Sequence, residues 1–260
     1  MPEMVEVEYY RRLAEDALDR TIVQVAAPDA WYLKRGLTKR ALTAALKGRS
    51  FVAARRVGKL LLLDVSDDGP TLGLRFGMSG KLVVDGTAGI DDLIYSSNLA
   101  LKKWDRFGVR FADGGHLLIR DPRRLGGVEL DPPEDRLGHD ASVVTPAALR
   151  QALESSAPLK ARLMDQAHLA GVGNLIADET LWRAGLDPAR PARSLDANEV
   201  RRLHRHLRRT VDDLLARGGS HTGDFLPHRR PGGACPKDGT PLVRRTVGGR
   251  TTWSCPKHQQ

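Results

Sequence analysis

The hydrophobic positions of the chain follow a helical period at the start and a strand-like pattern soon afterwards. A first helix is predicted from one apolar face, made of Val5, Tyr9, Leu13, Ala14, Ala17 and Leu18. The segment 21–26 predicts a strand, and 37–46 a short helix with Thr38 as its cap. From 51 to 84 the apolar runs are short and separated by turn residues, which is typical of β structure.

Two hairpins are visible in the first half of the chain. The runs 51–54 and 60–65 flank the turn 57–59, and the runs 109–111 and 117–119 flank Asp113-Gly114-Gly115. Frequent strands joined by tight turns, without alternating helices, predict an antiparallel sandwich. With the helices on either side of it, the fold class is α+β.

The second half of the chain is helical. Residues 131–135, rich in proline and acid, indicate a linker. Thr145-Pro146 opens one helix, a second carries Leu159, Leu163 and Met164, a third runs from Asn174 to Gly185, and Asp196 with Glu199 predicts a capping box for a fourth. We therefore divide the chain into a sandwich (1–130), a linker (131–144), a helical domain (145–231) and a small module rich in Gly, Cys and Pro (232–260).

The net charge of the chain indicates what class of partner it binds. The chain of 260 residues has a formal charge of +9 and a pI of about 9.9, which favours a polyanion such as nucleic acid. The basic run 201–209 lies opposite the apolar face of its helix, so we interpret it first as a solvated face and second as a DNA face. No apolar run approaches the roughly 20 residues of a membrane span, and no leader marks the chain for secretion.

The N-terminus offers a nucleophile. Removal of Met1 before the small Pro2 is expected to expose a secondary amine, and amines form Schiff bases with carbonyl carbons. Proline suits the first turn of a helix, and the dipole there favours the carboxylates of Glu3 and Glu6. The alternative is an ordinary amphipathic helix with an acidic start.

Both cysteines lie in the last module. Cys235 and Asp238 form one pair at x2 spacing, and Cys255 and His258 form another, which is the layout of a zinc ribbon. We expect one structural Zn²⁺ per chain, although aspartate is an unusual ligand in such a site. The alternative is a metal-free hairpin with two buried thiols. Gly248 and Gly249 would form the hairpin tip, leaving Arg250 able to reach a phosphate.

One further motif precedes the third helix. The segment 170–174, AGVGN, places glycines before a helix N-terminus, where backbone N–H groups bind phosphate well. A tight turn between packed helices is the other interpretation.

Together these segments resemble one enzyme family. PEMVEVE at 2–8 closely resembles the start of formamidopyrimidine-DNA glycosylases and endonuclease VIII enzymes, and LMDQ at 163–166 with GVGNLIADE at 171–179 resembles their helix-two-turn-helix motif. GMSG at 77–80, DPRRLG at 121–126 and the C-terminal ribbon are further matches. The resemblance covers essentially the whole chain. It implies a DNA glycosylase and abasic-site lyase that grips damaged duplex DNA between two domains.

The resemblance also implies roles for single residues. Pro2 would attack C1′ of the damaged nucleoside, and Glu3 would act as acid and base on the opened sugar. Lys59, Lys160, Asn174 and Arg250 would contact phosphates. Met78, Arg123 and Leu125 would fill the space left by the flipped nucleotide. We expect a monomer in the cytoplasm, associated with the nucleoid.

The chain departs from the family pattern in three places. Leu125 replaces a usual phenylalanine, Asp238 and His258 stand where cysteines are common, and only 226–234 separates Phe225 from Cys235, where enzymes specialised for 8-oxoguanine carry a much longer loop. We therefore expect removal of oxidised bases with weak action on 8-oxoguanine. The alternative is a protein that binds damaged DNA without cutting it.

Overall fold

The structure, a computed structural model, describes residues 2–90, 93–94 and 96–260. The chain forms two compact units, of which the first ends at Glu134 and the second begins at Asp135. This boundary falls within the segment predicted as a linker. The expected removal of Met1 concerns a residue outside the described ones.

The first unit is the predicted antiparallel sandwich. Among the described residues, one sheet has the strand order β1-β7-β8-β5-β6 and the other β2-β3-β4-β9. The strands are β1 (Ile22–Ala26), β2 (Phe51–Val57), β3 (Leu60–Val65), β4 (Thr71–Arg75), β5 (Lys81–Val84), β6 (Thr87–Ala88), β7 (Asp105–Phe111), β8 (His116–Arg120) and β9 (Gly127–Leu130). Strand β3 has its first four residues buried, which explains its continuous leucine run.

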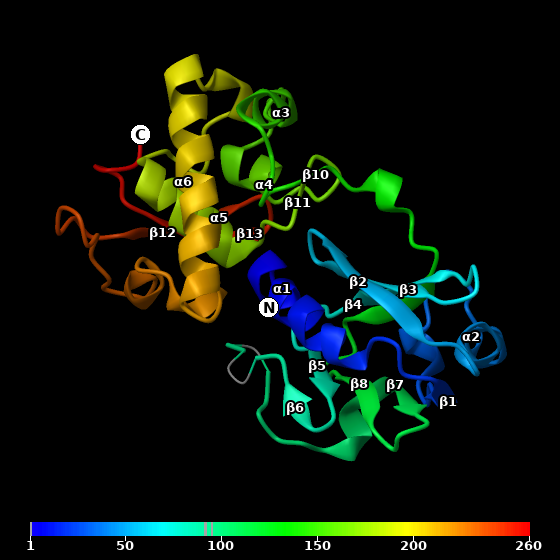
Figure 1. The fold of residues 1–260 in the computed structure, drawn as a ribbon. Helices are drawn as coiled ribbons and strands as arrows, with labels where there is room; N and C mark the ends of the chain where they lie inside the picture. Colours follow the sequence, from blue (N-terminus) through cyan, green and yellow to red (C-terminus); the bar gives the residue numbers. More distant parts are fainter. Residues whose placement is uncertain (1, 91–92, 95) are drawn as a thin grey trace. The chain divides into compact units, whose positions relative to one another are not determined.

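Helix α1 (Met4–Ala14) lies against β2, β3 and β5 of this sandwich (Figure 1). The predicted apolar face continued to Leu18, but the α-helix ends at Ala14 and a short 3₁₀ turn, Glu15–Ala17, follows. Leu18 is already extended and pairs with Phe51, so strand pairing ends the helical pattern early. Helix α2 (Lys39–Leu46) is capped by Thr38 as predicted, with Ala41 N donating to Thr38 Oγ1 at 3.2 Å.

The second unit contains the predicted helices and hairpin. Its main elements are α3 (Pro146–Ala152), α4 (Leu159–Leu163), α5 (Asn174–Ala184), α6 (Ala197–Ala216), β12 (Val243–Val247) and β13 (Arg250–Ser254). Helices α5 and α6 pack on each other (Figure 1). The capping box of Asp196 and Glu199 is confirmed, and the predicted core face of α6 is buried at Val200, Leu203, Leu207, Val211 and Leu214.

One pairing was not predicted. Strand β10 (His139–Asp140) pairs in parallel with β11 (Leu169–Ala170), so part of the expected linker belongs to the second unit. Two-residue strands carry too little pattern to be seen in a sequence. Within the described part of the chain, no helix combines the length and the hydropathy that crossing a bilayer requires.

Candidate active site and nucleic-acid interface

The start of α1 gathers carboxylates beside Pro2. Glu3 is the N-cap of the helix, and it forms a capping box with Glu6 in which the Glu3 N–H donates to Glu6 Oε2 at 2.7 Å. Pro2 is buried, and both glutamate side chains are almost completely buried. The helix N-terminus stabilises carboxylates. Local sequence alone therefore places a buried carboxylate directly beside the residue expected to be the nucleophile.

Helix α1 is tied to the turn that carries Lys59. Arg56 on β2 bonds Glu8 of α1 at 3.2 Å and donates to the Gly58 carbonyl at 2.9 Å. Burial favours the neutral acid at Glu8, but hydrogen bonds and charges from Arg11 and Arg56 prevail and lower its pKa. Lys59 is half-buried in this turn. The turn that carries the lysine is thus connected to α1 by an ion pair and a hydrogen bond of Arg56.

The same helix holds the loop that carries Met78. Tyr10 of α1 donates from its hydroxyl to the Gly80 carbonyl at 3.1 Å, and its ring lies 4.4 Å from that of Phe76, centroid to centroid. Burial raises the pKa of Tyr10 well above its usual value, and the charge of Glu6 adds to the effect. Met78 itself is half-buried between β4 and β5.

A buried aspartate organises this loop and the loop after β8. Asp121 is fully buried and accepts four hydrogen bonds: from Ser79 Oγ at 2.6 Å, Gly126 N at 2.9 Å, Arg123 N at 3.1 Å and Tyr32 Oη at 3.3 Å. Burial raises the pKa of Tyr32, and so does the charge of Asp121. The four donors to the carboxylate are neutral groups, and Arg106 Nε donates to the backbone carbonyl of Asp121 at 2.9 Å.

Met78, Arg123 and Leu125 therefore lie on two loops in direct contact. Gly77 has φ of +59°, and a Cβ added there would lie 2.4 Å from the backbone carbon of Leu125. Only glycine fits this approach. Leu125 is 51% exposed, and the Arg123 side chain is exposed as well. Both side chains are therefore accessible to solvent on a loop whose backbone is held in place by Asp121.

In the second unit, Gln166 shapes the turn before α5. Its side chain donates to the Val172 carbonyl at 3.0 Å and accepts from Gly171 N at 2.9 Å. Asn174 is the first residue of α5, and its Oδ1 is buried with no hydrogen-bond partner among the described residues. The backbone N–H groups of the first turn of α5, beside this side chain, are the donors that a helix N-terminus offers to an anion.

The cations expected at phosphates differ in exposure. Arg250 is exposed at the start of β13 and makes no ion pair with any residue that the structure describes. Lys160 has no exposed side-chain surface, and its ammonium lies 2.7 Å from Asp178 Oδ1. The ammonium of Lys160 is therefore not on the surface, where the family resemblance had led us to expect it.

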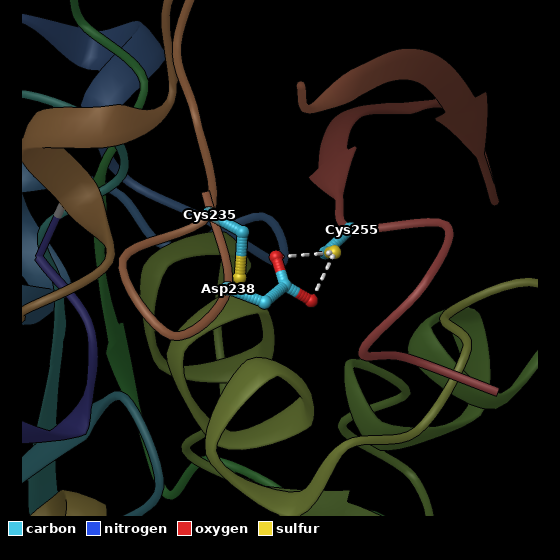
Figure 2. A group of neighbouring side chains, drawn as sticks. All are labelled: Cys235, Asp238 and Cys255. Atoms are coloured by element: carbon cyan, nitrogen blue, oxygen red, sulfur yellow. Dashed lines mark hydrogen bonds between the residues drawn. The ribbon is translucent and has the colours of Figure 1, made fainter. Parts of the chain in front are cut away.

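Three of the four expected metal ligands come together. The donor atoms of Cys235, Asp238 and Cys255 all lie within 4.8 Å of one another (Figure 2). Cys255 Sγ lies 3.5 Å from Asp238 Oδ2, and burial raises the pKa of this thiol. His258 donates its backbone N–H to Cys255 Sγ at 3.2 Å, but its imidazole Nε2 lies 2.8 Å from the Trp182 carbonyl.

Two thiols and a carboxylate at this spacing suit a divalent metal such as zinc. His258 Nε2 is already engaged, so the imidazole can join only through Nδ1 or after rotating away from Trp182. The Cys235 and Cys255 side chains also pack with Trp182, Phe225 and Trp253, so this end of the hairpin has an apolar core of its own.

Three positioning residues were missed by sequence reasoning. The sequence analysis assigned no role to Asp121, although it lies inside a recognised motif. It assigned no role to Asp178 or Arg229 either. Asp178 is fully buried and lies 2.7 Å from Arg229 Nη2. A carboxylate on the buried face of an apolar helix was the available signal, because such a group requires a partner.

Two family models match the chain. The model described as formamidopyrimidine-DNA glycosylase N-terminal domain covers residues 1–128, and the one described as formamidopyrimidine-DNA glycosylase H2TH domain covers residues 137–225. One match falls in each compact unit, and residues 226–260 lie outside both.

Curated relatives match over the whole length. A formamidopyrimidine-DNA glycosylase of Thermus thermophilus is 35% identical, covering 100% of this chain and 98% of that protein. The protein of that name from Paracoccus denitrificans is 33% identical over the full length of both. Among solved structures, the Lactococcus lactis enzyme bound non-covalently to DNA with an abasic site has a TM-score of 0.84 at 25% identity, covering 100% of both chains.

Proposed function

The chain belongs to the formamidopyrimidine-DNA glycosylase family and has that type of DNA glycosylase function, and on this premise we propose that it also cleaves the abasic strand through an iminium on Pro2. The observation that carries the proposal is the start of α1, where Pro2 directly precedes the buried, capping Glu3. We propose that it acts as a monomer on damaged duplex DNA in the cytoplasm.

The first step is a substitution at the sugar. After Met1 is removed, the Pro2 nitrogen forms a bond to C1′ while the bond between C1′ and the damaged base breaks. The base leaves with the bonding electrons and takes up a proton. Opening of the sugar ring then gives an iminium between Pro2 and C1′.

Strand cleavage follows by elimination. The iminium withdraws electrons, so a proton leaves C2′ and the bond from C3′ to its phosphate oxygen breaks. Glu3 is the group placed to move protons at the opened sugar, because its carboxyl neighbours the amine. A second elimination releases the other flanking phosphate, and water then adds to C1′ of the iminium, so that the bond between C1′ and the Pro2 nitrogen breaks and Pro2 is freed.

The remaining residues hold the DNA. We propose that Lys59, Asn174 and Arg250 contact phosphates near the lesion. Met78, Arg123 and Leu125 fill the space of the everted nucleotide, which offsets part of the few kcal/mol lost on unstacking. Their two loops are joined through Asp121, so they enter the duplex as one unit.

Substitution of the N-terminal pair tests the chemistry. Pro2→Gly and Glu3→Gln are expected to abolish base excision, while each variant still binds a duplex with a stable abasic analogue. The exposed Glu15 gives the matched control, and Glu15→Gln should incise at the wild-type rate. Unchanged incision by Pro2→Gly contradicts the mechanism. If the wild-type protein binds the damaged duplex but never incises it, the chain is a damage-binding protein.

The length of 226–234 bears on substrate choice. These nine residues contain two prolines and two glycines, and Arg229 is bound to Asp178. Such a link is too short and too fixed to fold over an everted purine, and Leu125 offers no aromatic wedge. We propose good activity at abasic sites and on ring-opened or hydantoin lesions and oxidised pyrimidines, with poor excision of 8-oxoguanine opposite cytosine. Single-turnover rates on a lesion panel test this, and an 8-oxoguanine rate equal to the best lesion contradicts it.

We propose that Cys235, Asp238 and Cys255 hold one Zn²⁺, with His258 as the fourth ligand. When bound, the metal supplies a structural crosslink between the two turns at the base of the hairpin. Elemental analysis of purified protein should find about one equivalent, and Cys255→Ala should lose it. Wild-type occupancy in His258→Ala removes the histidine from the ligand set and leaves the position to water.

A further inference from the structure

The buried ammonium of Lys160 has three acceptors for its three protons. Besides Asp178 Oδ1 at 2.7 Å, it donates to Thr252 Oγ1 at 2.8 Å and to the Thr251 carbonyl at 3.1 Å. Its side chain has no exposed surface. A lysine that neutralises a phosphate must present its ammonium to the DNA. Lys160 instead directs all its protons into the protein.

The hydrogen bonds of Lys160 continue through Thr252 to Arg250, which is proposed to contact a phosphate. Thr252, which accepts from Lys160, donates from the same hydroxyl to the Arg250 carbonyl at 3.0 Å. The hairpin tip is also seated on α4, because a Cβ added to Gly248 would lie 2.6 Å from Ala161 Cβ. The backbone of Arg250 is thereby fixed to the helix that carries Lys160.

Asp178, at the other end of these bonds, lies on the helix that begins with Asn174, the second residue proposed to contact a phosphate. Asp178 stands four residues after Asn174 on α5, so both lie on the same side of that helix. Its second oxygen binds Arg229 at 2.7 Å, in the short link before the hairpin. One buried carboxylate thus joins α4, α5, the link and, through Lys160, the hairpin.

We infer that Lys160 is a positioning residue, which holds Arg250 in place for a phosphate and does not itself touch the DNA. The inference rests on the proposed grip of Arg250 on the backbone. It assigns Lys160 a role different from the phosphate contact that the family resemblance implies, and it gives the hydroxyl of Thr252 a function in DNA binding.

A double-mutant cycle separates the two roles. Affinity for a duplex with a tetrahydrofuran abasic analogue is measured by fluorescence anisotropy from low to moderate salt. Arg250→Ala should lower the slope of log K against log salt by about 0.9, the value for one phosphate contact. Adding Lys160→Met to Arg250→Ala should leave that slope unchanged. A further drop of about 0.9 in the double variant shows a direct phosphate contact and overturns the inference.

A milder variant covers the case in which Lys160→Met fails to fold. Thr252→Val removes only the hydroxyl between Lys160 and the Arg250 carbonyl. It should weaken binding about threefold to tenfold in the wild-type background and less than about twofold in Arg250→Ala. The matched control is Thr251→Val, because Thr251 bonds Lys160 through its carbonyl only and its side chain is exposed.

Wild-type affinity in Thr252→Val overturns the inference, and wild-type affinity in Thr251→Val is expected. Failure of the proposed function is a different result. Protein that binds the duplex with this cycle intact but does not incise DNA refutes the lyase activity alone. A salt slope in Arg250→Ala equal to that of the wild type refutes the grip of Arg250, and with it the role of Lys160.

Discussion

Two buried aspartates organise the two units in different ways. The carboxylate of Asp121 accepts from neutral donors among the described residues, three of them within its own loop or the neighbouring one, and Arg106 donates to its backbone carbonyl at 2.9 Å. Asp178 binds two buried cations, Lys160 and Arg229, at 2.7 Å each. The first arrangement tolerates the loss of one partner, because the others remain. The second balances charges that cannot be solvated, so each member depends on the rest.

The largest expected effect follows from that charge balance. Asp178→Asn leaves two buried cations facing a neutral amide and should destabilise the protein by about 3–5 kcal/mol. Urea unfolding followed by tryptophan emission measures this. Asp212→Asn, on the exposed side of α6, is the matched control and should change stability by less than about 0.5 kcal/mol. Equal losses in the two variants contradict the charge balance assigned to Asp178.

A smaller loss is expected at Asp121. Ser79→Ala removes the shortest of its hydrogen bonds, at 2.6 Å, and should cost about 1.5–3 kcal/mol, the range for a bond to a charged group. The same urea titration applies. Arg123 N also bonds Asp121, so the loop that carries Arg123 should be less well held in this variant. Incision should therefore fall even at an assay temperature at which the variant is still folded. A loss above that of Asp178→Asn reverses the comparison.

The smallest effect is predicted for Tyr32→Phe. The Tyr32 hydroxyl meets Asp121 at 3.3 Å, a long bond, and three better donors remain. We expect the free energy of unfolding, measured by the same urea titration, to fall by roughly 0.5–1 kcal/mol. A loss as large as that of Ser79→Ala shows that the four bonds act as one cooperative network.

Local features of the fold were predictable from the sequence. The caps at Thr38 and Asp196, the turn at Gly58 and the end of α5 at Gly185 each depend on residues within a few positions of one another. The sandwich followed from short apolar runs and turns. The early end of α1 did not, because it depends on the pairing of Leu18 with Phe51.

The site was predictable to the same extent. Pro2 and Glu3, and the ligand pairs of the last module, are neighbours in the sequence. The network around Asp178 joins positions 160, 178, 229 and 252, which no local pattern connects. The family resemblance therefore singled out Lys160 but implied a phosphate contact for it. Its burial is a property of the packed unit.

Borohydride trapping tests the central claim most directly. The protein is incubated with a labelled duplex that contains one abasic site, sodium borohydride is added, and the adduct is digested and sequenced by mass spectrometry. The iminium on Pro2 should be reduced to a stable bond, giving one covalent product attached to the N-terminal peptide that begins at Pro2. An adduct on a lysine such as Lys59, or no adduct at a site that the protein demonstrably binds, contradicts the account.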